Sequence, residues 1–594
     1  MESKMDSYDP WAPFEREVRE HLSEALASLG ISTEPSLETP PPGMGDLALP
    51  CYTFSRELRE SPGEIAKRLK DLLEGRLYVA DVRGAYLNFA YRAEELIWRA
   101  LEVLSKRGED YGHLPEREGF IIVEHTSANP NGPFHVGRAR NPILGDSIVR
   151  ILRAAGWRAE AQYWVNDMGK QVMTLVWGVK NIPEEDLPGA EREKPDHLYV
   201  RYYQEAYRRI EEGVISEERI NYMLREYERA LEEGDKKRLI NHPEDSPTRA
   251  EEVREIVEEV LKGMDSSLRR LGVVVDRYVY ESQVVEDGTL KRVIEKLKSS
   301  PRAGVEEGAW YLDFSDKPIH GKTKRFVFTR SDGSALYTTR DMAYHLWKLG
   351  RCTRALNILG EDHKLQSFYL REALKELGVP HLPEVVFYSF VSLPEGKMST
   401  RRGRVVYLDD LMDEAVRRAK EEVRKRRSDL AEDEVTRIAE SVGLGALRYN
   451  IVKVQPEKKI VFRWEEALSF DGFSAPFVQY SHARACSILR KAVEIPPPDP
   501  SFAEHYRESG AVELLRAISK LPGAVREAAE KASPHIIAHR SYDIAKTFNE
   551  FYRDLPVLRA PEGVKEARLA LVWAAKVALA NSLNMLGIDA PERM

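Results

Sequence analysis

The sequence has very few cysteines and no long apolar run. Its three cysteines, Cys51, Cys352 and Cys486, lie too far apart for a CxxC metal site or a dense disulfide framework. No stretch approaches the roughly 18 uninterrupted apolar residues of a membrane span. The first residues, Met1 to Arg16, also lack the apolar segment of a secretory signal. These absences favour a protein of the reducing cytosol with no membrane segment.

Apolar and charged residues are both abundant. Apolar residues make up 42% of the chain and charged residues 31%, as in globular proteins with sizeable cores. At about 150 residues per domain, 594 residues predict several domains. The formal net charge of -8 argues at first against a nucleic-acid partner. However, residues 443–594 contain 21 basic and 18 acidic residues, so they carry +3 and the rest carries -11. Binding needs only local basic surface, so the total charge does not exclude RNA.

The chain opens with a helical pattern at 11–29 and a strand-like segment at 84–91. A second region alternates between strand and helix. A buried strand is predicted at 120–124, then a turn of Asn, Pro and Gly, a helix at about 138–155 and a strand at 159–165. This is a βαβ unit, in which ligands bind at the carboxyl ends of the strands.

Two further strands, at 356–360 and 385–393, are predicted to complete the sheet after a long insertion. The strongest helix of the insertion has Ser246 as its cap and Pro247 in its first turn. Its apolar residues at helical spacing are Val253, Ile256, Val257, Val260, Leu261 and Met264. The many charged residues around it indicate a solvated helical face. From 410 to 594 we expect helices throughout, except for the loop at 495–500.

The first chemical motif is Glu124-His-Thr-Ser-Ala-Asn-Pro-Asn-Gly-Pro-Phe-His-Val-Gly-Arg138, between a strand and a helix. Free backbone N–H groups at a helix start favour a phosphate. His135 can donate to phosphate oxygens, and Gly137 lets a flat base approach the backbone. A histidine near a glycine at a helix start is also common in proteins without a nucleotide, so this motif is weak alone.

The second motif is Gly396-Lys-Met-Ser-Thr-Arg-Arg-Gly403, which follows the last predicted strand. Its lysine, serine and arginines can position a triphosphate and stabilise departing pyrophosphate. An ordinary solvated basic loop is the alternative. The two motifs lie about 260 residues apart, each after a strand of one split sheet, and together they indicate a nucleotide site.

The pair of motifs resembles the two signatures of class I aminoacyl-tRNA synthetases, and within that class the chain is similar to arginyl-tRNA synthetases over nearly its whole length. The segments that carry this resemblance are Tyr163–Gln171, Ser331–Tyr344, Leu359–His363, Gly445–Tyr449, Ala475–Tyr480 with Ala483 and Arg484, and Asn584–Met594. Gly45, Asp46 and Tyr86–Phe89 are similar to the N-terminal domain of this family, and Asn166–Lys170 resembles its archaeal members.

The resemblance implies an α/β protein with a Rossmann-type catalytic domain, an α+β N-terminal domain and an all-α anticodon-binding domain. The expected segments are an N-terminal tRNA-contacting domain at 1–112, the first catalytic half at 113–180, a helical insertion at 181–310, the second catalytic half with the Lys-Met-Ser loop at 311–409, and the anticodon-binding domain at 410–594. The implied activity is an arginine–tRNA ligase. L-arginine and ATP would give arginyl-adenylate, and the arginyl group would pass to the 3'-terminal adenosine of tRNA(Arg), with bound tRNA required for the first step.

The family pattern assigns residues to each part of the site. The guanidinium pocket would be Glu124, Asn129, Tyr337 and Asp341. The paired carboxylates suit a planar fork of N–H donors, and substrates without that fork would leave buried carboxylates unpaired, so no editing domain is needed. The ATP site would contain His135, Gly137, Gly360, Asp362, His363 and Lys397, although His363 could equally be an ordinary loop histidine. The catalytic set would be His135, Gly137, Arg138, Lys397, Met398, Ser399 and Arg401.

Two departures from the family pattern concern charge. The first signature ends in Arg138 where histidine is usual, and the second lacks its final lysine. Many members that lack this lysine carry another ahead of the first signature, but residues 128–132 contain none. Arg138, Arg401 or Arg402 could supply the charge, and the sequence leaves these three open.

The resemblance implies tRNA contacts at Arg448, Tyr449, Phe477, Tyr480, Arg484 and Asn88. The alternative for each of the aromatic residues is a place in the hydrophobic core, where most aromatic side chains lie. We expect a cytoplasmic monomer that uses ATP with Mg²⁺ and has no dedicated protein metal site. The rival interpretations are another class I synthetase and a non-catalytic tRNA-binding relative. The Tyr337 and Asp341 pair argues against the first, and the retention of both signatures argues against the second.

Overall fold

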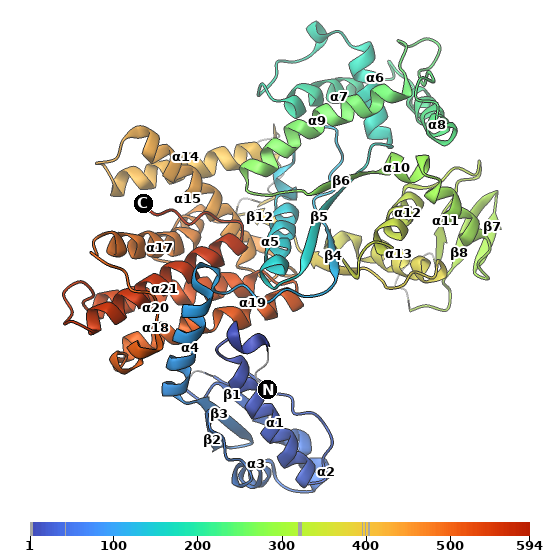
Figure 1. Cartoon of the computed structure of the whole chain (residues 1–594). Coiled ribbons are helices and arrows are strands. Elements are labelled where there is room, and N and C mark those ends of the chain that lie inside the picture. Colours follow the sequence, from blue (N-terminus) through green and yellow to red (C-terminus); the bar gives the residue numbers. More distant parts are fainter. Residues whose placement is uncertain (1–3, 42, 319–323, 395, 398–399, 402–403) are drawn as a thin grey trace.

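The structure is a computed structural model that describes residues 4–41, 43–318, 324–394, 396–397, 400–401 and 404–594. A central sheet is flanked by an N-terminal α+β domain, inserted helices and a C-terminal group of helices (Figure 1). The N-terminal domain extends from one end of the molecule, next to helix α4 (Ala93–Arg107). The α/β class with an α+β N-terminal domain and a helical C-terminal domain is confirmed.

The N-terminal domain is built on a three-stranded antiparallel sheet of order β1-β3-β2. Its strands are β1 (Leu47–Pro50), β2 (Tyr78–Arg83) and β3 (Tyr86–Tyr91). Helix α3 (Pro62–Asp71) packs on the sheet, and α1 (Ala12–Ser28) presents Phe14, Val18 and Leu22 to the same core. This core is separate from the main one, so the domain buries its own apolar surface.

The central sheet is parallel, with strand order β11-β10-β4-β5-β6. Its strands are β4 (Phe120–Glu124), β5 (Arg158–Val165), β6 (Arg277–Tyr280), β10 (Arg354–Gly360) and β11 (Glu384–Tyr388). Strands β4 and β10 are neighbours and pair Glu124 with Asn357. Helix α5 (Arg140–Ala154) connects β4 to β5. Strand β6 was not predicted from the sequence, because Arg-Tyr-Val-Tyr contains no continuous apolar run.

The insertion contains mostly helices; in Figure 1 α6 to α9 lie above β6, and α10 and α11 lie to its right beside α12. They are α6 (Lys170–Asn181), α7 (Pro195–Glu211), α8 (Glu217–Glu233), α9 (Ala250–Arg270), α10 (Glu281–Glu286) and α11 (Thr289–Lys298). Helix α9 begins at Ala250, so the predicted start at Ser246 is wrong. The N–H of Thr248 donates to the Asn241 side chain and its carbonyl accepts from Ile240, which keeps this segment extended.

A small antiparallel sheet follows the insertion and leads into two helices next to the main sheet. It consists of β7 (Ala303–Glu306), β8 (Ala309–Asp313) and β9 (Arg325–Val327), and the helices are α12 (Tyr337–Leu349) and α13 (Lys364–Glu376). The strand predicted at 385–393 is two strands, β11 and β12 (Val391–Leu393). The break falls at Ser389, whose carbonyl accepts from the buried Arg140 guanidinium.

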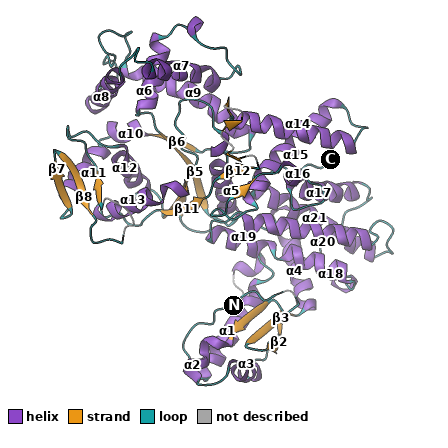
Figure 2. Ribbon diagram, turned by 180° about the vertical axis from the view of Figure 1, so that it is seen from behind, coloured by secondary structure: helices purple, strands orange, loops and turns teal. Residues whose placement is uncertain are grey.

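The C-terminal region is helical but contains one short strand, β16 (Ile460–Val461), so the expectation of helices throughout is wrong there. Strand β16 pairs with β12 and ties this region to the end of the sheet. The helices are α14 (Leu408–Arg426), α15 (Glu432–Val452), α16 (Trp464–Ala467), α17 (Ala475–Arg490), α18 (Ser509–Ser519), α19 (Leu521–Glu530), α20 (His535–Asp554) and α21 (Val564–Met585). In the described part of the chain, none of the helices has the length and hydropathy to cross a bilayer. Figure 2 shows these helices from behind as one packed group.

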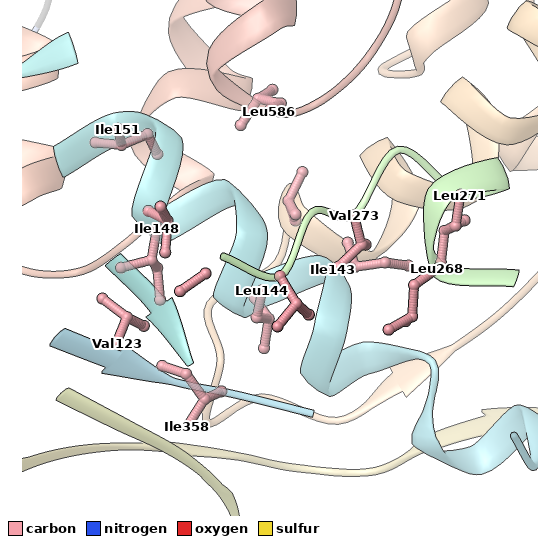
Figure 3. Close-up of a cluster of buried hydrophobic side chains, with 14 of the residues drawn as sticks. Val123, Ile143, Leu144, Ile148, Ile151, Leu268, Leu271, Val273, Ile358 and Leu586 are labelled. Carbon is pink, nitrogen blue, oxygen red and sulfur yellow. The ribbon is translucent and has the colours of Figure 1, made fainter. Parts of the chain in front are cut away.

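The catalytic sheet and the C-terminal helices share one hydrophobic core. Ile148 of α5 points toward Val123 of the sheet, Ile143 points toward Leu268 and Val273 of the insertion, and Leu586 lies on the other side of α5 (Figure 3). Helix α5 is apolar on several sides because it is covered by both layers. The sheet therefore has a rigid support on the C-terminal side, and its carboxyl edge is fixed relative to the helices.

Candidate active site

The first signature loop follows β4 at the carboxyl edge of the sheet. His135 lies in extended backbone before the short 3₁₀ turn Val136–Arg138, and its side chain is exposed. Partial burial and the nearby Arg138 charge lower the pKa of His135, so its imidazole is neutral at physiological pH. A Cβ at Gly137 would meet nothing within 4 Å, so the space beside this backbone is open. A neutral histidine can donate a hydrogen bond to a phosphate, and the open backbone beside it leaves room for a base.

The backbone between β4 and α5 is strained. Thr126 and Ser127 have φ values of 71° and 42°, in the left-handed region that a β-branched residue rarely adopts. Asn141 of α5 holds this bend, because its Oδ1 accepts from the Thr126 N–H at 2.6 Å and its Nδ2 donates to the Ile358 carbonyl at 2.9 Å. This positioning residue was not identified from the sequence, although an asparagine in the first turn of the helix was the available signal.

The predicted guanidinium pocket lies between α12 and the end of β4. Tyr337 and Asp341 are four residues apart on α12, as predicted, and Tyr337 is 45% exposed. Glu124 at the end of β4 is buried, and its Oε2 accepts from the Lys348 ammonium at 2.7 Å. Tyr337 and Asp341 therefore lie on the first half of α12, and Glu124 contacts the same helix at Lys348. Two carboxylates and a phenol are the composition that suits a planar cation.

Two amide residues extend this pocket and were not predicted. Gln366 of α13 donates to the Tyr337 hydroxyl, which places a second helix beside the pocket. Gln171 of α6 accepts from Asn129 at 2.7 Å, so Asn129 is held toward the start of that helix. Gln171 belongs to one of the segments that carry the family resemblance, whereas nothing in the sequence singled out Gln366.

The predicted ATP residues Gly360, Asp362 and His363 follow β10 directly. Asp362 and His363 are exposed, and their side chains approach each other to 3.7 Å. A Cβ on Gly360 would lie 2.5 Å from the Asp362 carboxylate, so the exposed Asp362 side chain would have to turn away from its present position. The three residues are next to β4 through the β4–β10 pairing and face the same edge as His135.

The second signature lies partly outside the described residues. Lys397 is in the short strand β13 (Gly396–Lys397), which pairs with β12, and Arg401 is in β14 (Thr400–Arg401). Met398, Ser399 and Arg402 fall outside the described residues. Beyond the loop, Tyr407 forms an antiparallel bridge with His135, and their rings lie 5.8 Å apart. The structure thus brings the segment that follows the second signature against the first signature.

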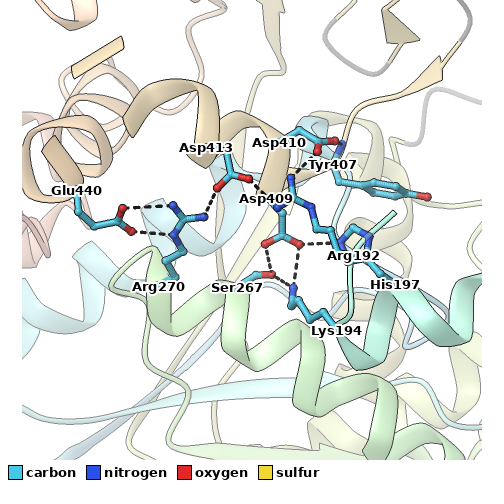
Figure 4. Close-up of polar contacts among 10 residues, drawn as sticks. All are labelled: Arg192, Lys194, His197, Ser267, Arg270, Tyr407, Asp409, Asp410, Asp413 and Glu440. Atoms are coloured by element: carbon cyan, nitrogen blue, oxygen red, sulfur yellow. Dashed lines mark hydrogen bonds and ion pairs between the residues drawn. The ribbon is translucent and has the colours of Figure 1, made fainter. Parts of the chain in front are cut away.

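A polar network continues from this bridge into the insertion (Figure 4). Asp409 at the start of α14 accepts from His197 and Lys194, each at 2.8 Å, and from Ser267 of α9. Burial alone would raise the pKa of Asp409, but these hydrogen bonds outweigh it and lower the pKa well below the ordinary range. Arg270 of α9 links the same helix α14 to α15 through further carboxylates. The insertion is therefore tied to the segment that follows the second signature.

Asp196, His197 and Asp409 also meet the distance requirement for a metal site, the one such group among the residues that the structure describes. The Lys194 ammonium lies 3.1 Å from Asp196 and 2.8 Å from Asp409 and already supplies the compensating charge. We therefore interpret the cluster as an ion-pair network and assign no metal to it.

The residues predicted to contact tRNA separate into exposed and buried groups. Tyr480 on α17 is 38% exposed and lies beside Arg484, whose guanidinium is 4.8 Å from the Tyr480 ring. Arg484 also approaches the exposed ring of Tyr552 on α20 at 5.5 Å. Phe477 is half-buried against Tyr542. Stacking surfaces around a cation form a suitable site for unpaired bases, and Tyr552 is an addition to the predicted set.

The other three predicted tRNA residues are buried, and the structure argues against direct contact with RNA. Arg448 is 1% exposed and is paired with Asp146, while Tyr449 is fully buried and donates to the Ala538 carbonyl at 2.6 Å. Asn88 is 4% exposed within β3. Arg448 and Tyr449 join different layers of the fold, and Asn88 is buried in its own sheet, so the predicted contact with RNA is wrong for these three side chains.

Family models match three parts of the chain. The description "tRNA synthetases class I (R), catalytic domain" covers residues 101–464. "DALR anticodon binding domain" covers 478–594, and "Arginyl tRNA synthetase N terminal domain" covers 16–91. The order of the three matches follows the order of the structural regions described above.

Full-length relatives and solved structures agree with these matches. The chain is 44% identical to an arginine–tRNA ligase of Methanocella arvoryzae, over 96% of this chain and 98% of that protein. It is 42% identical to one of Methanothermobacter thermautotrophicus, over 98% and 99%. The solved Thermus thermophilus arginyl-tRNA synthetase is 31% identical, with a TM-score of 0.81 over 98% of this chain and all of that chain. A Plasmodium falciparum arginyl-tRNA synthetase shares the fold at 18% identity, with a TM-score of 0.77 over 98% of this chain and 99% of that chain.

Proposed function

The chain belongs to the class I arginyl-tRNA synthetase family and is an arginine–tRNA ligase, and we propose the following roles for its residues in that reaction. An oxygen of the arginine carboxylate attacks the α-phosphorus of ATP, the bond to pyrophosphate breaks, and arginyl-adenylate forms. A hydroxyl of the 3'-terminal adenosine of tRNA(Arg) then attacks the adenylate carbonyl and releases AMP. The bridge between His135 and Tyr407 supports the site assignment, because it joins the first signature to the segment that follows the second signature.

Glu124, Tyr337 and Asp341 bind the guanidinium in this proposal, and Asn129 holds the α-amino or carbonyl end. The two carboxylates offer paired acceptors, which a guanidinium satisfies with parallel N–H bonds. A lysine side chain has no planar fork, and citrulline has no charge. Either would leave a desolvated carboxylate without its bonds, which supports discrimination by binding alone.

ATP binds across the carboxyl ends of β4 and β10. The adenine approaches the open backbone at Gly137, and Asp362 accepts from a ribose hydroxyl, with Gly360 and His363 beside it. His135 and Lys397 stabilise the phosphates, together with the Met398 and Ser399 segment. Arg138, Arg401 and Arg402 are the arginines that could replace the charge of the missing lysine. Mg²⁺ enters as the ATP complex and needs no dedicated protein site.

The C-terminal helices bind the anticodon region of tRNA, with Tyr480, Arg484 and Phe477 as contacts. Tyr552 completes a surface on which an aromatic ring is available on each side of the Arg484 guanidinium. Binding of tRNA precedes arginine activation, as expected for this family. We further propose a cytoplasmic monomer, divided into the N-terminal, catalytic, inserted and anticodon-binding segments given above.

ATP–pyrophosphate exchange tests the proposal directly. Exchange should depend on L-arginine and on added tRNA(Arg), and should not occur with lysine or citrulline. Exchange with another amino acid would contradict the arginine pocket. Absence of exchange even with tRNA would contradict the activity itself. Exchange without tRNA would contradict only the proposal that tRNA must bind before arginine is activated.

A further inference from the structure

The two carboxylates assigned to arginine are joined beneath the pocket by an unbroken chain of buried side chains. Lys348 donates from Nζ to Glu124 at 2.7 Å and to Asn357 Oδ1 at 2.8 Å. Asn357 Nδ2 lies 2.8 Å from His345 Nε2, and His345 Nδ1 lies 3.1 Å from Asp341 Oδ1. Lys348 is fully buried, and Asn357 and His345 are each 2% exposed. This series of hydrogen bonds links Glu124 at the end of β4 to Lys348 on α12, then to Asn357 on β10, and returns to α12 at His345 and Asp341.

The direction of every hydrogen bond in this chain follows from the lysine. An ammonium can only donate, so the oxygen of the Asn357 amide must face Lys348 and its NH₂ must face His345. His345 Nε2 must then accept, which leaves the proton on Nδ1, where it is donated to Asp341. The His345 Nδ1 also lies 2.9 Å from the Asp341 backbone carbonyl, which holds the ring in this orientation.

The net charge of these hydrogen-bonded side chains is opposite to the charge of the guanidinium. Glu124 and Asp341 carry two negative charges, Lys348 carries one positive charge, and the His345 tautomer is neutral. One net negative charge therefore faces a guanidinium that carries one positive charge. Other titratable groups around the chain are Tyr344, whose ring lies 4.4 Å from the Lys348 ammonium, with His125 next to Glu124 and Cys352 near Lys348.

We propose that Lys348, Asn357 and His345 are positioning residues for arginine selection, which fix the charge of the pocket and aim both carboxylates at the guanidinium. This inference rests on the arginine pocket proposed above. It assigns a role to three α12 and β10 residues that do not touch the substrate. On α12, Tyr337, Asp341, His345 and Lys348 are spaced at four, four and three residues, so they share one helix face.

The test is the Lys348→Met variant, measured as separate KM values for arginine and ATP in tRNA-dependent ATP–pyrophosphate exchange. Without Lys348 the buried Glu124 carboxylate loses the donor that orients it. The arginine KM should rise by roughly ten-fold or more, because a charged hydrogen bond to the substrate is weakened. The KM for ATP and the tRNA affinity should stay unchanged. In Glu124→Gln/Lys348→Met the arginine KM should rise no further than in Glu124→Gln alone, since Lys348 acts through Glu124.

A second pair of variants keeps the test independent of the folding of Lys348→Met. His345→Asn retains an N–H that can reach Asp341, and His345→Phe does not, so Asn should preserve the arginine KM better than Phe. The proposal is overturned if Lys348→Met has the native arginine KM, if the KM values for ATP and arginine rise together, or if His345→Asn and His345→Phe behave alike. If the native enzyme itself shows no arginine-dependent exchange, the proposed function fails instead.

Discussion

Arg448 of α15 and Asp146 of α5 form a buried ion pair, with 2.6 Å between the guanidinium and the carboxylate. Arg448 also donates to the carbonyls of Leu271 and Leu586, so one side chain joins the sheet layer, the insertion and the C-terminus. Burial raises the pKa of Asp146 on its own, but Arg448 and Arg150 outweigh it and keep the carboxylate ionised. Arg448, which was predicted from the sequence to contact tRNA, therefore stabilises the packing of three parts of the fold.

Replacement of this arginine should cost stability without a direct effect on tRNA contacts. We expect Arg448→Met to lower the free energy of unfolding by about 3–5 kcal/mol, because Asp146 and two carbonyls lose a buried partner. Thermal unfolding measures this loss. The matched control is Arg484→Met, which should unfold like the native protein but bind tRNA roughly ten-fold more weakly, since base stacking contributes about 1–3 kcal/mol per base. Equal stability of the two variants would contradict the assignment.

The pocket prediction is tested by Asp341→Asn, which keeps the shape and removes one charge. Arginine use should fall by at least about 100-fold in kcat/KM, since a charged hydrogen bond to the substrate is lost. The measurement is tRNA-dependent exchange at varied arginine. Binding of tRNA should be unaffected, and unchanged arginine kinetics would exclude Asp341 from the pocket. The neighbouring Asp332→Asn, on an exposed turn, serves as the control.

The central strands and both signature loops were predicted from sequence because their patterns are local. Strand β4 is a continuous apolar run, and a parallel sheet makes its carboxyl end a ligand site. Strand β6 and the role of Lys348 were not predictable in this way, because each depends on a partner far away in the sequence. The distinction between Arg448 and Arg484 is also tertiary: each lies close in sequence to a tyrosine, and the packing against α5 is what buries Arg448.

Asp409 should matter for both stability and turnover. Its pKa is lowered in the folded protein, so its stabilising contribution is present above the ordinary carboxyl range and is lost as the pH falls through the folded value. Asp409→Asn should lower the melting temperature at pH 7. It should also reduce kcat for exchange by about ten-fold with little change in KM, because α14 follows the second signature directly. The exposed Glu421→Gln on the same helix should change neither value.

Acid sensitivity should arise in part from His125. Burial lowers its pKa to about 4 from an ordinary value of 6.5. Below about pH 6.5 the unfolded chain takes up a proton that the folded protein does not, so stability is lost as the pH falls toward 4. His125→Asn should flatten this part of the profile by on the order of 3 kcal/mol at most. Unfolding followed from pH 7 to pH 4 gives the comparison, and parallel profiles for both proteins would contradict it.

Gly137 and Gly145 should respond in opposite ways to the same methyl group. A Cβ at Gly137 meets nothing within 4 Å, so Gly137→Ala should leave stability within about 0.5 kcal/mol of the native value. If adenine lies against this backbone, the methyl group must obstruct it, and the KM for ATP should rise about ten-fold while the arginine KM stays constant. At Gly145 a Cβ would lie 2.3 Å from His125, so Gly145→Ala should destabilise the fold instead. If the KM for ATP is unchanged in Gly137→Ala, then adenine does not lie against the Gly137 backbone, and the adenine position proposed above is wrong.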